Sequence, residues 1–169
     1  MAKIFLTQLV NPAQTVTYAN VAGLTVSASR SMDVRVVTPD TPGTYPVVFY
    51  SHGHSANPGT VGSTNARALA DQGYIVVLPT HIDSAANPAV LRDAYPIENP
   101  ASTLHRVADI KYAFDNLQRV MAPATGYVAD TSRPVMAGHS HGSWVTYLLT
   151  GAVPNDPAYT ALPSGNPYG

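Results

Sequence analysis

The sequence predicts a single α/β domain, because segments with strand patterns alternate with segments with helix patterns along most of its length. Two runs, 46–51 and 74–79, are apolar on both faces, which is typical of central strands covered on both sides. Each of these strands is followed by a helix pattern, and this order after an opening hairpin favours a largely parallel sheet with flanking helices. The alternating elements are strands at 46–51, 74–79 and 134–137 and helices at 64–72, 99–121 and 143–150.

The length and composition fit one domain and exclude several functional classes. The 169 residues are 45% hydrophobic, enough for a core, and they include no cysteine, which excludes disulfides, a thiolate nucleophile and a cysteine-based zinc site. The net charge of −1 gives no electrostatic attraction to nucleic acid or to an anionic membrane. No apolar run approaches the roughly 18 residues of a membrane span, and the run 4–10 is too short for a signal-peptide core. The low share of charged residues, 11%, favours a secreted or periplasmic location.

The opening hairpin is predicted from two short alternations of apolar and polar residues. These alternations, at 24–29 and 33–36, have the period of two that half-buried strands show. The segment 38–43 contains two prolines and a glycine, which favour a turn, and it leads into the strand at 46–51.

The clearest helix pattern covers 99–121. Asn99 is a favourable N-cap residue, and Pro100 suits the first helical position. Apolar residues then recur every three or four positions and predict a stripe that faces the core: Leu104, Val107, Ile110, Phe114, Leu117 and Met121. Asp115 and Arg119 are spaced to form an ion pair on the solvent side of the same helix.

Three segments that follow predicted strands are expected to meet. Ligands of α/β sheets bind beyond the carboxyl ends of the strands, because the connecting loops gather at that edge. The tips 52–57, 81–84 and 138–142 each follow a strand. We therefore expect these tips to converge on one functional site.

The segment Gly138–Gly142 has the pattern G-x-S-x-G between a predicted strand and a predicted helix. So tight a turn requires residues without bulk two positions before and after Ser140, and it exposes the Ser140 Oγ at its apex. Such a nucleophile needs two backbone N–H donors for a developing oxyanion. The N–H of His141 is one candidate, and the N–H of His54, after the flexible Gly53, is the other.

Three histidines at these tips, His52, His54 and His81, raise the alternative of a metal site. Against a metal, 52–57 contains no carboxylate, and a His-x-His pair at a strand tip has the wrong geometry to chelate alone. We expect no metal and no organic cofactor.

Four stretches of the chain, from about residue 33 to residue 150, resemble the α/β-hydrolase superfamily. They read PVVFYSHGH at 46–54, ALADQGYIVVLP at 68–79, RVADI at 106–110 and AGHSHG at 137–142. In particular they are similar to the platelet-activating-factor-acetylhydrolase and dienelactone-hydrolase-like branch, to which chlorophyllases and polyester hydrolases are related. The resemblance implies Ser140 as nucleophile and the amides of His54 and His141 as oxyanion donors. Dienelactone hydrolases proper use cysteine, so the chain is closer to the serine esterases.

The chain departs from this superfamily after the serine. The superfamily order is serine, then acid, then histidine, but only 29 residues follow Ser140, with Asp156 as the one acid and no histidine beyond His141. We interpret His81, His105, His139 and His141 as loop or helix-surface residues. The stretch 151–169 holds four prolines and three glycines and predicts a loop. We therefore interpret 1–169 as the N-terminal part of one hydrolase domain, without its last strands.

The sequence hypothesis is a serine hydrolase that cleaves small or polymeric carboxylic esters through an acyl-enzyme on Ser140. The acid and the base would come from a C-terminal segment outside this chain, either a nicked or a second polypeptide. An acyltransferase, a thioesterase or a peptidase on the same fold stays open, as does an inactive binding protein. Tyr95 and Trp144 are candidates for an apolar substrate pocket, although such residues more often pack in the core.

Overall fold

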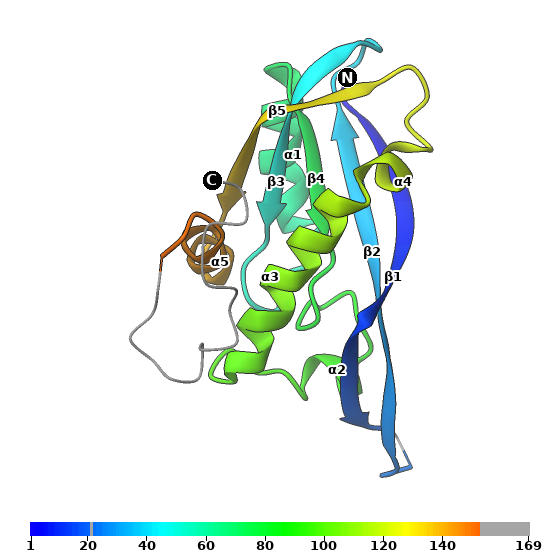
Figure 1. Cartoon of the computed structure of the whole chain (residues 1–169), viewed down its shortest axis with the longest axis vertical. Coiled ribbons are helices and arrows are strands. Elements are labelled where there is room, and N and C mark those ends of the chain that lie inside the picture. The colour runs from blue at the N-terminus through cyan, green and yellow to red at the C-terminus, as the bar shows by residue number, and fades with distance from the viewer. Residues whose placement is uncertain (21, 153–169) are drawn as a thin grey trace.

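The computed structural model describes residues 1–20 and 22–152, which form a five-stranded sheet with helices on both faces (Figure 1). The strands lie in the order β1-β2-β4-β3-β5. Their bounds are β1 Lys3–Ala19, β2 Thr25–Thr38, β3 Thr44–Ser51, β4 Ile75–Pro79 and β5 Val128–Gly138. The helices are α1 Val61–Asp71, α2 Ala89–Arg92, α3 Pro100–Asp115, α4 Leu117–Met121 and α5 His141–Leu149.

The sheet is mixed, and the strands of one half, β4, β3 and β5, are parallel. Strand β3 pairs in parallel with β4 on one side and with β5 on the other. Strand β2 runs antiparallel to both β4 and β1. The predicted α/β class is confirmed, and the central strands predicted at 46–51 and 74–79 are buried on both faces for most of their length.

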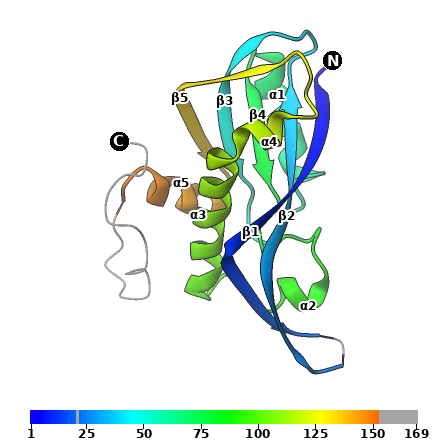
Figure 2. The same ribbon diagram turned by 45° about the vertical axis from the view of Figure 1, so that its right-hand side comes forward.

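Each face of the sheet is covered by its own helices (Figures 1 and 2). Helix α1 packs on one face, where Ala66 and Ala70 meet Val48, Val76 and Leu78. Helices α3, α4 and α5 pack on the opposite face, whose larger core includes buried residues of all three helices. Alternate residues of β3 and β4 thus serve two different cores, which explains why these strands are continuously apolar.

The opening hairpin is much longer than predicted. Strand β2 is one strand of 14 residues rather than two short ones, and it pairs along its length with β1, a strand that the sequence analysis did not predict. The far end of the hairpin extends beyond the main body and past α2 (Figure 1). Leu24, expected on a buried face, is 65% exposed. Tyr95, which follows α2, anchors this arm because its hydroxyl group bonds the backbone N–H and carbonyl of Thr17.

The helix predicted at 99–121 is two helices. Asn99 does cap α3, accepting a hydrogen bond from the N–H of Ala101 at 3.0 Å. The chain then leaves helical geometry at Asn116, where α3 ends and α4 begins. The predicted pairing of Asp115 with Arg119 is wrong: Asp115 pairs with Lys111 at 2.7 Å, one turn earlier in the same helix.

The remaining elements differ from prediction at their ends. Helix α1 begins three residues before the predicted 64–72, α5 begins two residues before the predicted 143–150, and β5 extends the predicted 134–137 on its N-terminal side. The segment 81–98, between β4 and α3, contains the short helix α2. The predicted loop 151–169 falls almost wholly outside the described residues. None of the described helices has the length and apolar character needed to cross a membrane.

Within the described residues, β1 and β5 form the two edges of the sheet. Large apolar side chains are exposed at the β5 edge, on β5 itself and on α5. They are Val128, Val135, Trp144 and Tyr147. A strand edge without a partner strand, with exposed apolar neighbours, is a surface that proteins normally cover.

Candidate active site

The three tips that follow β3, β4 and β5 meet at the carboxyl end of the parallel half of the sheet, as predicted. The N–H of His81 donates to His52 Nε2 at 3.1 Å, which joins the tips of β4 and β3. The N–H of His139 donates to the carbonyl of Ser51 at 3.2 Å, which joins the tips of β5 and β3. Side chains from all three tips therefore share one site.

The turn between β5 and α5 has the close packing that the glycine spacing predicts. A Cβ at Gly138 would lie 2.3 Å from the carbonyl oxygen of Gly142, and one at Gly142 would lie 2.0 Å from that of Ser51. Ser140, at the apex, is exposed and has a φ of 54° and a ψ of −123°. This backbone conformation is unfavourable for a residue with a side chain, so the surrounding packing must hold it.

The loop 52–54 lies against this turn. A Cβ at Gly53 would lie 3.1 Å from His139 Nδ1 and 3.4 Å from the Cβ of Ser140, so the loop and the turn are close neighbours. The backbone N–H groups of His54 and His141 donate to no acceptor within the described part of the chain. The second described non-glycine residue with a positive φ, Ser55 at 52°, follows directly in the same loop.

A buried ion pair between Asp83 and Arg106 lies beneath the loop. Arg106 Nε and Nη2 donate to the two oxygens of Asp83 at 2.9 and 2.7 Å, and both side chains are fully buried. Arg106 also donates to the backbone carbonyls of His52 and Gly53. His54 Nδ1 donates to Asp83 Oδ2 at 2.7 Å. Burial by itself would raise the pKa of Asp83, but the hydrogen bonds and charge of Arg106 outweigh it and hold that pKa well below its usual range.

A second buried pair, Arg30 with Asp109, lies next to the first. Arg30 donates to both oxygens of Asp109 at 3.2 and 3.3 Å. His81 Nδ1 bonds Asp109 at 3.1 Å, and His81 Nε2 bonds the hydroxyl of Ser51 at 2.9 Å. Burial, together with the charge of Arg106, lowers the pKa of His81 well below its usual value, so its imidazole is neutral. Burial also raises the pKa of Asp109, against the opposing charge of Arg30.

His52 is held as a neutral ring in one tautomer. Its Nε2 accepts from the N–H of His81, so the proton lies on Nδ1, which donates to the carbonyl of Gly53 at 2.8 Å. Burial, followed by the charge of Arg106, lowers the pKa of His52 to about 4. Near neutral pH the ring is thus a fixed hydrogen-bonding element rather than a charged one.

The interpretation of four histidines as loop or helix-surface residues is wrong for His141, a buried residue of α5, whereas His81 lies in a loop as interpreted but is buried. His81 is fully buried in the second ion cluster. His141 is also buried and bonds the hydroxyl of Thr103 through Nε2 at 2.8 Å, and burial lowers its pKa to about 4. The burial of both could not be foreseen, because a histidine next to a loop gives no sequence signal of burial. His139 is exposed, and His105 packs edge-on against the ring of Tyr95.

Three potential metal ligands lie together at the site. One ring nitrogen of His54, one ring nitrogen of His141 and an oxygen of Asp83 are within 4.8 Å of one another. The segment 52–57 contains no carboxylate, but Asp83, in the loop after β4, supplies one. The fixed positive charge of Arg106 on the same carboxylate oxygen opposes a divalent cation there, and the absence of a metal stays a prediction on this electrostatic ground.

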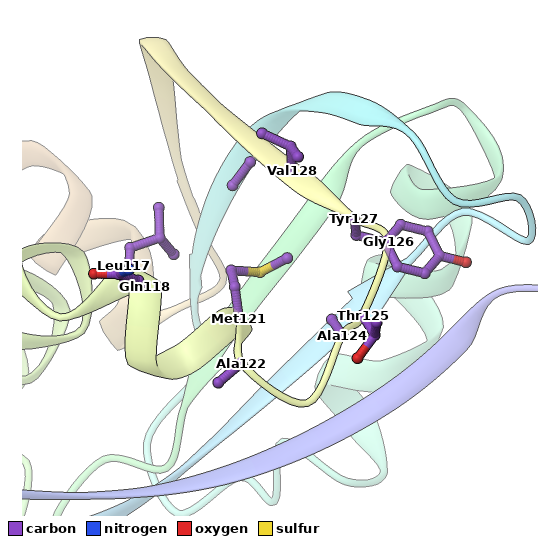
Figure 3. Close-up of a pocket in the computed structure, with 10 residues that line it drawn as sticks. Leu117, Gln118, Met121, Ala122, Ala124, Thr125, Gly126, Tyr127 and Val128 are labelled. Atoms are coloured by element: carbon purple, nitrogen blue, oxygen red, sulfur yellow. The ribbon is translucent and has the colours of Figure 1, made fainter.

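A groove of about 460 Å³ lies at the opposite end of β5 from Ser140, between α4 and the start of β5 (Figure 3). Its lining is mostly apolar and includes Leu117, Met121, Tyr127 and Val128. None of the residues at the three tips contributes to it. The two aromatic residues proposed for a pocket do not line it either, and Tyr95 is buried against the hairpin.

The sequence analysis missed four buried charged residues: Asp83 and Arg106 at the site, and Arg30 and Asp109 in the adjacent ion pair. The available signal was in the stretch 106–110, where Arg106 and Asp109 fall among the apolar positions of α3. The buried face of α3 includes both of them, next to Val107 and Ile110. Charged residues at buried helix positions must have partners, and this was the pattern that could have identified them.

The arrangement of strands, turn and loop defines an α/β-hydrolase fold, and solved structures agree. A ferulic acid esterase from Streptomyces cinnamoneus matches 87% of this chain with a TM-score of 0.65 and 18% identity. An acylaminoacyl peptidase from Pyrococcus horikoshii matches 86% with a TM-score of 0.56 and 15% identity. The esterase Est22 matches 89% with a TM-score of 0.55 and 24% identity.

A family model for chlorophyllases matches residues 9–161, and the chain belongs to the chlorophyllase family. No curated protein matches the sequence at a significant level. The chain spans about half of the Streptomyces esterase, 54%, and 38% of Est22. Family and fold together place the chain among the esterase-like α/β-hydrolases.

Proposed function

We propose that this chain is the nucleophile-bearing part of a serine hydrolase that cleaves carboxylic esters. The observation that carries the proposal is the turn at Ser140, which is exposed with a positive φ between two glycines that tolerate no side chain. Such a strand–turn–helix arrangement is a nucleophile elbow, which presents the serine Oγ to a substrate. Membership of the chlorophyllase family and the esterases among the structural neighbours support the same chemistry.

The proposed reaction has two steps. The Ser140 Oγ attacks the ester carbonyl carbon and loses its proton to a base, and the alcohol leaves after protonation, which gives an acyl-enzyme. Water then attacks the acyl carbon and releases the acid. In both steps the negative charge on the carbonyl oxygen would be bound by the backbone N–H groups of His54 and His141, which have no other acceptor within the described residues.

We propose that the acid and the base come from a C-terminal segment outside this chain. The support is the partial coverage of the structural neighbours and the apolar side chains exposed at the β5 edge. The intact masses of all polypeptides in the denatured, purified protein test this directly. A second polypeptide carrying an acid and a histidine is expected, and a sample of the 17.8 kDa chain alone, with full activity, would overturn it.

The nucleophile is tested by labelling with a fluorophosphonate and by the substitution Ser140→Ala. We expect one label per chain, located on Ser140 by peptide mass spectrometry, and loss of ester hydrolysis in the variant. Ser63→Ala, which removes a partly exposed hydroxyl on α1 that bonds only the local carbonyl of Thr60, is the control and should leave both unchanged. Hydrolysis that persists in Ser140→Ala would disprove the assignment.

A peptidase is the second candidate, because acylaminoacyl peptidases are among the structural neighbours. The same elbow could also serve an acyltransferase or a thioesterase. Comparing p-nitrophenyl esters, thioesters and N-acyl amino acid amides on the same preparation separates these classes. A protein that hydrolyses none of these substrates and does not react with the fluorophosphonate would instead be a catalytically inactive binding protein with this fold.

A further inference from the structure

We propose that Arg106, together with Asp83, is a positioning residue that sets the direction of the His54 N–H in the oxyanion site. The inference rests on the proposed function and adds the residues that hold one of its two donors in place. It follows from hydrogen bonds that converge on the loop 52–54 from below.

The carbonyl of Gly53 is held by three donors at once. Arg106 Nη2 donates to it at 3.1 Å, His52 Nδ1 at 2.8 Å and the N–H of Ala56 at 3.2 Å. Arg106 Nη1 also donates to the carbonyl of His52. Two consecutive peptide groups of the loop are thus bonded to the same guanidinium.

The direction of the His54 N–H follows from this contact. The Gly53 carbonyl and the His54 N–H belong to one peptide group, which is planar and trans, so the two point in opposite directions. When the carbonyl points to the buried Arg106, the N–H points away from the interior. A Cβ at Gly53 would lie 3.4 Å from the Cβ of Ser140, so the peptide group that carries this N–H is close to the proposed nucleophile.

The His54 side chain supplies a second attachment. Its Nδ1 donates to Asp83 Oδ2 at 2.7 Å, and Asp83 in turn receives two hydrogen bonds from Arg106. Backbone and side chain of His54 are therefore fixed by the same ion pair. This matters because the next residue, Ser55, has a φ of 52°, a conformation that persists only where neighbouring contacts enforce it.

Arg30 provides a matched control within the same buried network. It is as buried as Arg106, it forms the same two-bond pair with a carboxylate, and its backbone acceptors are the carbonyls of Ser31 and Thr80. None of these hydrogen bonds reaches the loop 52–54. A purely structural role would make the conservative substitutions Arg106→Lys and Arg30→Lys equivalent in their effects on catalysis.

The kinetic test compares these two variants with the wild-type protein, together with any C-terminal segment that copurifies. Loss of one oxyanion donor costs about 100- to 1,000-fold in kcat, so a misdirected donor in Arg106→Lys should cost about 10- to 100-fold, with KM changed less than about threefold. The affinity for a boronic acid, which forms a tetrahedral adduct with the serine, should fall in the same proportion. Arg30→Lys should change kcat by less than about threefold. Equal losses of kcat in the two variants, or a loss confined to KM, would overturn the proposal.

A second measurement does not depend on activity. NMR order parameters of the His54 amide should be about 0.85 in the wild-type protein, should fall below about 0.6 in Arg106→Lys and should be retained in Arg30→Lys. A mobile His54 amide in the wild-type protein overturns the proposal even if the variants do not fold. A protein without Ser140-dependent hydrolysis, but with this pattern of order parameters, would refute the proposed function and leave the positioning role of Arg106 standing.

Discussion

Replacing Gly142 by alanine tests whether the turn at Ser140 depends on contact between backbones. The added Cβ would lie 2.0 Å from the carbonyl oxygen and 2.6 Å from the carbonyl carbon of Ser51, and 2.9 Å from the oxygen of His52. Ordinary contact begins at about 3.4 Å. Because the obstructing atoms are backbone, no rotamer change relieves the overlap, and α5 must move away from β3 by roughly 1 Å.

The size of the effect follows from the kind of strain. Overpacking in a dense interior costs about 1 to 3 kcal/mol, and a clash with backbone belongs at the upper end, about 3 kcal/mol. For a chain of this length that corresponds to a fall in Tm of roughly 6 to 12 °C. The same displacement moves Ser140 relative to the loop 52–54, and a misplacement of about 1 Å can cost about 100-fold in rate.

The assay is urea unfolding monitored by circular dichroism, with Gly62→Ala as the matched control. Gly62 is also a helical glycine, but the nearest atom to its added Cβ is a side-chain methyl of Leu78 at 3.2 Å, which can shift. The control should change the free energy of unfolding by no more than about 1 kcal/mol, since alanine also favours the helix. If Gly142→Ala were as stable as Gly62→Ala, the reasoning about this turn would be refuted.

Three further outcomes follow from the structure. Folding lowers the pKa of His52 from 6.5 to about 4, so the unfolded chain takes up a proton at this residue before the folded chain does as the pH falls. The free energy of unfolding should therefore decrease between pH 6.5 and pH 4, by up to about 3 kcal/mol for this residue. Equal urea midpoints at pH 7 and pH 4.5 would contradict this. Tyr95→Phe removes the bonds to the backbone of Thr17 and should cost about 1 kcal/mol in urea unfolding, with unchanged stability as the contrary result. Asp115→Ala breaks only the exposed pair with Lys111, so a loss above about 1 kcal/mol in the same assay would count against our reading of that pair.

Much of the fold could be predicted because its signals are local. Strands β3 and β4 are apolar on both faces, and only a sheet covered on both sides requires that pattern. Asn99 followed by Pro100 marks the start of α3 through bonds within one turn. The glycines of the turn at Ser140 are likewise explained by contacts that the tight geometry itself dictates.

Strand β1 could not be predicted because its alternation is interrupted. Leu9 and Val16 are both buried, yet their spacing of seven would place them on opposite faces of a regular strand. The pairing with β2 shifts between Asn11 and Thr15, and this irregularity turns the later residues to the other face. The sequence pattern alone therefore looked aperiodic.

The incorrect prediction of an ion pair between Asp115 and Arg119 also has a structural cause. Asp115 has a basic residue four positions away on either side, and spacing alone does not distinguish Lys111 from Arg119. The break at Asn116 decides between them, because Arg119 no longer lies one helical turn from Asp115. The break at this single residue depends on tertiary packing. The sequence did not reveal it, because the apolar stripe continues through it to Met121.

The two buried ion pairs beneath the site are the part that sequence reasoning could not supply, and their energetics argue for a role in geometry. A buried pair is often no more stabilising than apolar residues of the same volume, because each charge loses its hydration. Apolar side chains, however, make no directional contact with a carbonyl oxygen. Arg106 bonds two successive carbonyls and fixes Asp83, which in turn holds His54. What this pair contributes, and a hydrophobic replacement would not, is a defined orientation of the peptide groups that face Ser140.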